Sequence, residues 1–229
     1  MSPRPRTVQD DVILDAAVLV VSRVGAERMT LADVGKAVGL SAATLVQRFG
    51  SKRELMLALL KHAIGDIDAR FDSAVAAHNS PLDALFAAAG ERPGPMKGPV
   101  PAANRFAFYM SQLDDPEFRA VAESHSLTAI AGFKRLLDSA VEAGELSAGY
   151  TDTKQLADTI YSMTMGSLVT WTVLNEGTLK NKVHRDLDIL LRPFRRRPRK
   201  ASGTTSSDRP ATKSVDAFAA GGADSRQGQ

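Results

Sequence analysis

The twenty residues TLADVGKAVGLSAATLVQRF, numbered 30–49, contain the pattern that decides the fold of this chain. Thr30 and Ser41 each precede a short apolar-periodic run, and their hydroxyls can accept backbone N–H groups at a helix start. Gly39 falls between the two runs, where a tight turn needs a left-handed backbone. Gly35 is small enough to let two steeply crossing helices touch. The segment therefore predicts a helix-turn-helix.

The second helix of this pair, about residues 42–48, leaves one face free because Leu45 is needed for packing. A major groove about 12 Å wide admits such a helix, and its outward side chains can reach base edges. Gln47 suits adenine and Arg48 suits guanine, although each can instead be an ordinary solvated residue. Polar groups at the helix starts favour phosphate. The expected DNA-binding residues are Thr30, Ser41, Ala42, Thr44, Val46, Gln47, Arg48 and Lys52.

Helical signals continue on both sides of the motif. Thr7 and Asp10 resemble a capping box before a first helix, and Ser51-Lys-Arg-Glu54 has the same pattern before a long one. Residues 90–101 hold three glycines and four prolines, which predicts a surface loop. The remaining helices are expected at 81–89, 102–113, 116–143, 153–175 and 179–191. The predicted fold is all-α: a three-helix DNA-binding domain followed by a helical ligand-binding and dimerisation domain.

The motif and its surroundings resemble TetR-type transcriptional regulators over residues 8–68. The likeness rests on the Gly39-Leu-Ser41 turn, Thr44-Leu45, Phe49 and the helix start Ser51-Lys-Arg-Glu-Leu55. It implies a homodimer of all-helical subunits that binds an operator, commonly as a repressor, and a variable C-terminal domain that binds a small-molecule effector.

Two residues depart from the family pattern. The family commonly has alanine where Gly35 stands and tyrosine where Val46 stands. Glycine costs about 1 kcal/mol of helix propensity, whereas valine removes a hydroxyl donor from the DNA-facing surface. We therefore expect the contact pattern to differ, with more of the affinity supplied by Arg48 and Lys52.

These signals divide the chain into four expected parts. They are an arm at 1–7, the DNA-binding domain at 8–68, the effector and dimer domain at 69–194 and a disordered basic tail at 195–229. The tail holds eight Lys or Arg against three Asp, so the rest of the chain has a net charge of −2. Global charge therefore says little about DNA binding. The tail either adds salt-dependent affinity or only improves solubility.

The C-terminal domain contains bulky apolar residues among a few polar groups, which is typical of a pocket between helices. The candidates for ligand binding are Phe106, Tyr109, Met110, His125, Met163, Met165 and Trp171. Shortage of charge here favours an apolar or aromatic ligand, but methionine and aromatic residues at helical spacing are also ordinary core. By family resemblance the last two helices form the dimer interface, with Leu168, Trp171, Leu174, Leu187 and Leu191 as expected contacts.

Other functional classes find little support. The chain has no cysteine, so it has no disulfide, thiolate metal site or cysteine nucleophile. Motifs for a nucleophilic serine, a P-loop or a dinucleotide are absent, and His62 with Asp66 is weak support for a metal. No metal or cofactor is expected. Without a secretory or membrane-spanning segment, a cytoplasmic location is expected. An architectural DNA binder without sequence preference remains the alternative, and an all-helical enzyme is less favoured.

Overall fold

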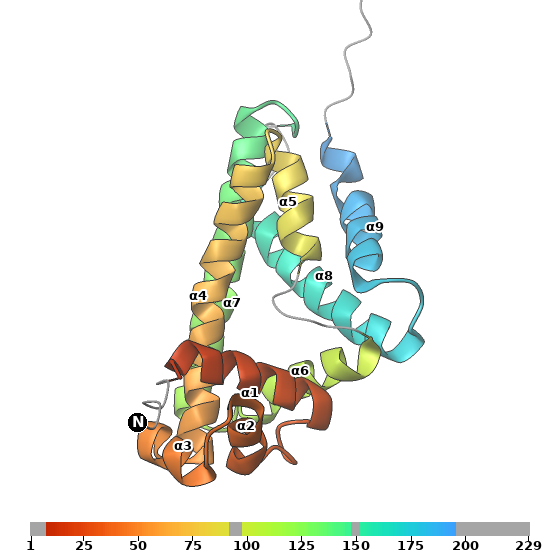
Figure 1. Cartoon of the computed structure of the whole chain (residues 1–229). Helices are drawn as coiled ribbons and strands as arrows, with labels where there is room; N and C mark the ends of the chain where they lie inside the picture. Colours follow the sequence, from red (N-terminus) through yellow and green to blue (C-terminus); the bar gives the residue numbers. More distant parts are fainter. Residues whose placement is uncertain (1–7, 92–97, 148–151, 196–229) are drawn as a thin grey trace, which may run out of the picture. The chain divides into compact units, whose positions relative to one another are not determined.

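A computed structural model describes residues 8–91, 98–147 and 152–195, with the side chains of 63–66 excepted. All of them belong to one unit, residues 1–196. Within these residues the regular structure is helical, apart from a bridge between Leu146 and Arg195. The helices are α1 (Asp10–Val24), α2 (Leu31–Val38), α3 (Ala42–Phe49), α4 (Lys52–Ala77), α5 (Pro81–Gly90), α6 (Pro99–Ser111), α7 (Pro116–Glu142), α8 (Thr153–Leu174) and α9 (Leu179–Leu191), with a 3-10 turn at Arg192–Phe194 (Figure 1).

The caps expected around the motif are present. The Thr30 hydroxyl accepts the Asp33 N–H at 3.1 Å, and the Asp33 carboxylate accepts the Thr30 N–H at 3.0 Å, which completes a capping box. Gly39 ends α2 in the left-handed conformation, with φ 70° and ψ 28°. Hydrogen bonds from Thr30 also lower the pKa of Asp33, which keeps the carboxylate ionised near the positive end of the helix dipole.

A close contact explains the glycine at position 35. A Cβ atom at Gly35 would lie 2.5 Å from the Leu40 carbonyl oxygen. The Leu40 N–H also donates to the Gly35 carbonyl at 2.8 Å, so the turn folds back directly on this residue. The α2–α3 turn therefore depends on the missing side chain, as the sequence suggested.

Two hydrophobic cores position the functional surfaces. The first core is formed by helices α1, α2, α3 and α4. Each contributes a wholly buried side chain: Ile13, Val34, Leu45 and Leu55. It also includes Phe108 of α6 and Phe118 of α7. The helices after the motif thus take part in the core that holds it.

The second core lies among α4, α5, α7, α8 and α9. Its centre is Phe71, wholly buried and edge-on to Phe133 at a centroid distance of 5.1 Å. Gly132 of α7 lies against the same ring, because a Cβ there would be 2.5 Å from two Phe71 ring carbons. Close approach of α4 and α7 requires a glycine at that place.

Several predicted boundaries are wrong. The first helix begins at Asp10 with Gln9 as its N-cap and without a side-chain cap, while Thr7 lies outside the described residues. The expected loop at 90–101 is shorter, because Gly90 still belongs to α5 and α6 begins at Pro99. Prolines fit there because the first turn of a helix needs no N–H donors. The tail beyond Arg195 lies outside the described residues.

Candidate nucleic-acid interface and ligand cavity

Helix α3 is anchored by one face and open on the other. Leu45 is wholly buried, and Phe49 is partly buried beside it. Ala42, Ala43 and Gln47 are exposed, and the Val46 side chain is 46% exposed. A short helix held in this way can enter a groove of duplex DNA.

The helix starts carry exposed hydroxyls that are already used as caps. The Ser41 hydroxyl accepts the Thr44 N–H at 3.0 Å and lies 2.8 Å from the Thr44 hydroxyl. Thr30 likewise caps α2 while remaining exposed. Because a hydroxyl oxygen has two lone pairs and its proton can rotate, these groups stay compatible with a phosphate contact.

The two basic residues expected to carry affinity are held within the protein. The Arg48 guanidinium forms an ion pair with Asp10 and donates to the Val8 carbonyl, both at the start of α1. Lys52 donates to the Glu27 carbonyl at 2.9 Å. Gln47 makes no hydrogen bond or ion pair with the described residues. Gln47 is therefore presented freely, whereas Arg48 would have to leave Asp10 to reach DNA.

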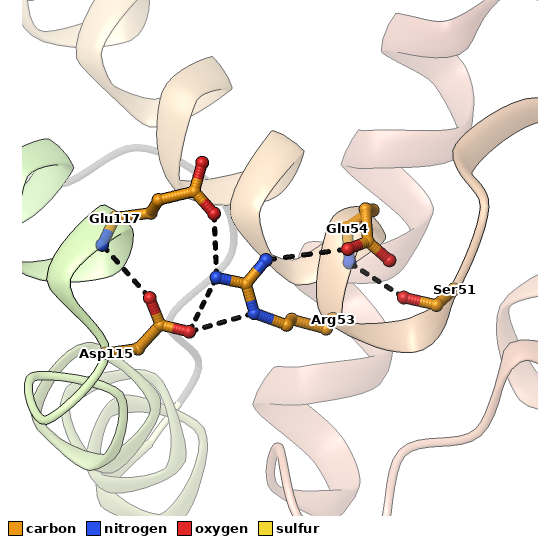
Figure 2. Close-up of polar contacts among 5 residues, drawn as sticks. All are labelled: Ser51, Arg53, Glu54, Asp115 and Glu117. Carbon is orange, nitrogen blue, oxygen red and sulfur yellow. Dashed lines mark hydrogen bonds and ion pairs between the residues drawn. The ribbon is translucent and has the colours of Figure 1, made fainter.

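An ion-pair cluster at the first turn of α4 joins the motif to the rest of the chain (Figure 2). Arg53 donates to the Asp115 carboxylate at 2.8 and 2.6 Å and to Glu117 at 2.7 Å. Asp115 also caps α7 by accepting the Glu117 N–H at 3.0 Å. Arg53 lowers the pKa of Asp115, and the two carboxylates raise the pKa of Arg53.

Sequence reasoning missed this cluster. It predicted a helix start at residue 116 and another after Ser51. It had no means to pair Arg53 with Asp115, because the two residues are 62 positions apart. A charged residue in the first turn of a helix is usually solvated, so neither residue signalled a partner.

A cavity of about 150 Å³ lies between α1, α4, α5, α6, α7 and α8. Four of the predicted ligand-binding residues line it: Phe106, Tyr109, His125 and Met165. The other three do not. Met110 is 47% exposed, Met163 packs against the second core, and Trp171 is buried with its indole N–H donating to Gly177 at 3.2 Å. Burial at helical spacing cannot by itself separate a cavity wall from ordinary core.

Polar residues of the cavity were largely missed. Arg70, Arg105, Tyr161 and Thr164 also face it. Tyr109 and Tyr161 are joined through Ser126, whose hydroxyl lies 2.9 and 2.8 Å from theirs. The search for a ligand site in the sequence favoured apolar side chains, so the arginines of α4 and α6 were not among its candidates.

Most of the expected dimer contacts lie inside the subunit. Leu187 and Leu191 are wholly buried, and Leu168 and Trp171 are each only 6% exposed, so these four belong to the core of their own subunit. Leu174 alone of the five is at the surface, at 58% exposed. Apolar residues that α8 and α9 do expose are Val169, Val173 and Ile189. The period of a helix does not reveal which of two apolar stripes faces inward.

Among the described residues, no group of three or more metal-ligand side chains comes together. His62 lies 3.4 Å from Asp15 and 3.7 Å from Asp11 of α1, while the side chain of Asp66 is outside the described residues. Within the same residues, none of the helices is both long and apolar enough to cross a membrane.

The motif, its exposed third helix and the helical body behind it define a helix-turn-helix protein with an all-α second half. Comparison with known proteins agrees. Residues 13–59 match the family described as bacterial regulatory proteins, tetR family. A comparison with curated proteins found no significant match.

Solved structures with this fold cover most of the chain. A putative regulator from Saccharomonospora viridis in complex with choline has a TM-score of 0.67 and 16% identity, over 82% of this chain and 98% of its own. A TetR-family regulator from Cytophaga hutchinsonii has a TM-score of 0.66 and 16% identity, over 82% and 96%. FadR from Bacillus subtilis in complex with stearoyl-CoA has a TM-score of 0.61 and 16% identity, over 80% and 97%. Residues 13–59 thus match the tetR family model, and the fold of the chain is that of TetR-family regulators.

Proposed function

We propose that this protein is a sequence-specific, cytoplasmic DNA-binding regulator that acts as a homodimer and leaves its operator when a small molecule binds. The observation that carries the proposal is the geometry of α3. Its buried face is fixed by Leu45, while Val46 and Gln47 are exposed beside capped helix starts. The net charge of the folded part is not positive, which favours base readout over purely electrostatic attraction.

Ligand response is supported by the position of the cavity. Val18 and Val21 of α1 line it together with Leu59 and Leu60 of α4, the helices that also form the first core. A molecule bound there would contact the helices that hold α3. It would weaken DNA binding if it fits better with a displaced α1 or α4, since a ligand shifts an equilibrium only by its differential affinity. Two structural neighbours were solved with bound small molecules, choline and stearoyl-CoA.

Dimerisation is supported by the surface of the last two helices. Val169, Val173 and Leu174 of α8 and Ile189 of α9 are each at least 40% exposed. These residues replace the buried leucines as the proposed contacts. A two-fold dimer presents two copies of α3, so the operator should be pseudo-palindromic, with half-sites about one helical turn apart or a multiple of it.

Selection of bound duplexes from a random pool by the full chain tests the proposal. We expect a pseudo-palindromic consensus, bound about 10³-fold or more tightly than random duplex. Gln47→Ala should alter the preference at one position of each half-site. The alternative, an architectural DNA binder, predicts no consensus and nearly equal affinity for all duplexes, and that result would overturn the proposal.

A further inference from the structure

The wall of the cavity between α1, α4, α5, α6, α7 and α8 is apolar and cationic. Most of its described residues are aliphatic or aromatic, and none of them is Asp or Glu. Two arginines, Arg70 and Arg105, and His125 face the same space. Since a wall of this kind places positive charge around the ligand and offers an ammonium group no carboxylate among the described residues, its charge selects for an anion.

Arg70 is the strongest sign that an anion belongs there. Its Nε atom is buried and has no hydrogen-bond partner among the described residues. The guanidinium makes one long hydrogen bond, 3.5 Å to the Glu91 carbonyl, and stacks 5.3 Å from the Phe71 ring centroid. The Glu91 carboxylate lies 3.7 Å from Lys180 instead. Burial lowers the pKa of Arg70, yet an arginine stays charged at neutral pH.

A guanidinium with a buried, unused N–H is costly, because buried donors are normally hydrogen-bonded. A carboxylate ligand would supply both the opposite charge and the hydrogen-bond acceptor. Arginine is suited to this because its fork of N–H groups matches the two carboxylate oxygens.

The remaining polar groups offer hydroxyls without adding negative charge. Burial raises the pKa of Tyr109 to about 12. Tyr109 and Tyr161 both contact Ser126, at 2.9 and 2.8 Å between the hydroxyl oxygens. Neutral phenols add no negative charge to this part of the wall.

The apolar part of the cavity limits the size of the ligand. Phe106, Phe108 and Phe133 stand among its walls, and its volume is about 150 Å³. A cavity of about this size lined by Leu, Ile and Phe accepts benzene. One aromatic or alicyclic ring therefore fits.

We infer that the cavity binds a small carboxylate whose apolar part is about one ring in size, with Arg70 as the partner of its carboxylate. This inference names the ligand class for the proposed ligand response and rests on that proposal. The carboxylate goes beyond the apolar or aromatic ligand that the sequence favoured, because the sequence did not place Arg70 at the cavity.

Three ring compounds of similar shape and different charge test whether the cavity prefers an anion. Benzoate, benzamide and benzylamine carry one negative charge, none and one positive charge on the same ring. Isothermal titration of the full wild-type chain should give benzoate at least about tenfold tighter binding than benzamide, as expected for a charge-assisted pair, and no binding of benzylamine. Equal affinity for benzoate and benzamide, or preference for benzylamine, would overturn the inference. Inorganic phosphate, an anion without a ring, should bind far more weakly than benzoate.

Substitutions at Arg70 test whether this residue binds the carboxylate of the ligand. Arg70→Met should lower benzoate affinity about tenfold or more and leave benzamide affinity nearly unchanged. Arg70→Lys should retain part of the benzoate affinity that Arg70→Met loses. Arg135→Met is the matched control, because Arg135 is exposed on α7 and pairs with Asp72 at 3.3 Å, away from the cavity wall. Circular dichroism and thermal unfolding establish that each variant folds. Benzoate binding that survives Arg70→Met unchanged would contradict the assignment.

Asp66 provides a further check, since an acidic residue four positions before an arginine in a helix can pair with it. We expect Asp66→Asn to bind benzoate at least as tightly as wild type. Equal losses of benzoate affinity in Asp66→Asn and Arg70→Met would show a structural pair and overturn the assignment.

Operator binding measured without benzoate separates this inference from the proposed function. Selective DNA binding by a protein that does not bind benzoate would contradict this inference alone. Absence of selective DNA binding would contradict the proposed function.

Discussion

The ion pair between Arg48 and Asp10 yields a prediction that separates a DNA contact from a structural tie. Arg48 belongs to α3, but its guanidinium is turned toward Asp10 and the Val8 carbonyl at the start of α1. If Arg48 contacts DNA, it must first leave Asp10. We therefore expect Asp10→Asn to tighten operator binding and Arg48→Ala to weaken it.

The magnitudes follow from exposure. The Arg48 side chain is 25% exposed and that of Asp10 is 61% exposed, so their pair should contribute about 0.2 to 1 kcal/mol to the free protein. Freeing Arg48 from it should raise operator affinity by up to about fivefold. Arg48→Ala should reduce affinity by about 1 to 3 kcal/mol and relax the preference at one base pair. Asp10→Asn removes an acidic residue from the start of α1 as well as the ion pair. Beyond the loss of the pair, this should lower the free energy of unfolding by up to about 1 kcal/mol.

Fluorescence anisotropy with the selected operator, at one fixed salt concentration, measures these affinities. The double variant Asp10→Asn with Arg48→Ala should bind like Arg48→Ala alone, since Asp10 acts only through the arginine. Urea unfolding of the same proteins gives the stability change separately. Arg48 does not contact DNA in this way if Arg48→Ala binds the operator within about twofold of wild type with unchanged base preference, or if Asp10→Asn binds it less tightly than wild type.

Three further outcomes are expected. Leu45→Ala should lower the free energy of unfolding by about 2 to 5 kcal/mol in urea titrations, because the side chain is wholly buried under α3; an unchanged midpoint would contradict this. Gly132→Ala should also destabilise, since overpacking against the Phe71 ring costs about 1 to 3 kcal/mol and helix propensity returns only about 1; a higher melting temperature would count against it. The stability advantage of wild type over Arg53→Gln should be full above about pH 4 and shrink as pH falls further, because Arg53 lowers the folded-state pKa of Asp115; a pH-independent difference between the two urea curves would exclude that coupling.

Local chemistry made the motif predictable. Caps, turn glycines and helical periodicity act within a few residues, so α2, the start of α3 and the start of α4 follow from the sequence near Thr30, Ser41 and Ser51. Helix α9 also lies where it was expected, at about residues 179–191, and the structure adds Thr178 as the cap of its start.

Contacts between distant segments were not predictable in this way. Arg53 with Asp115 and the cavity position of Arg70 depend on which helices pack together, and periodicity leaves that open. The inward position of most expected dimer contacts was not predictable for a related reason. Leu187 and Leu191 form an apolar stripe, and a stripe has the same period whether it meets its own subunit or a partner.

Entry of α3 into the DNA is the central claim, and a single cysteine can test it directly because the chain has none of its own. Gln47→Cys places a thiol on the exposed face of α3, and Glu123→Cys places one on the exposed surface of α7. Both proteins would be incubated with the selected operator carrying a disulfide-tethered base in its major groove. A cross-link is expected with Gln47→Cys at one base position in each half-site, and none with Glu123→Cys. No cross-link from Gln47→Cys, or equal cross-linking by both variants, would contradict it.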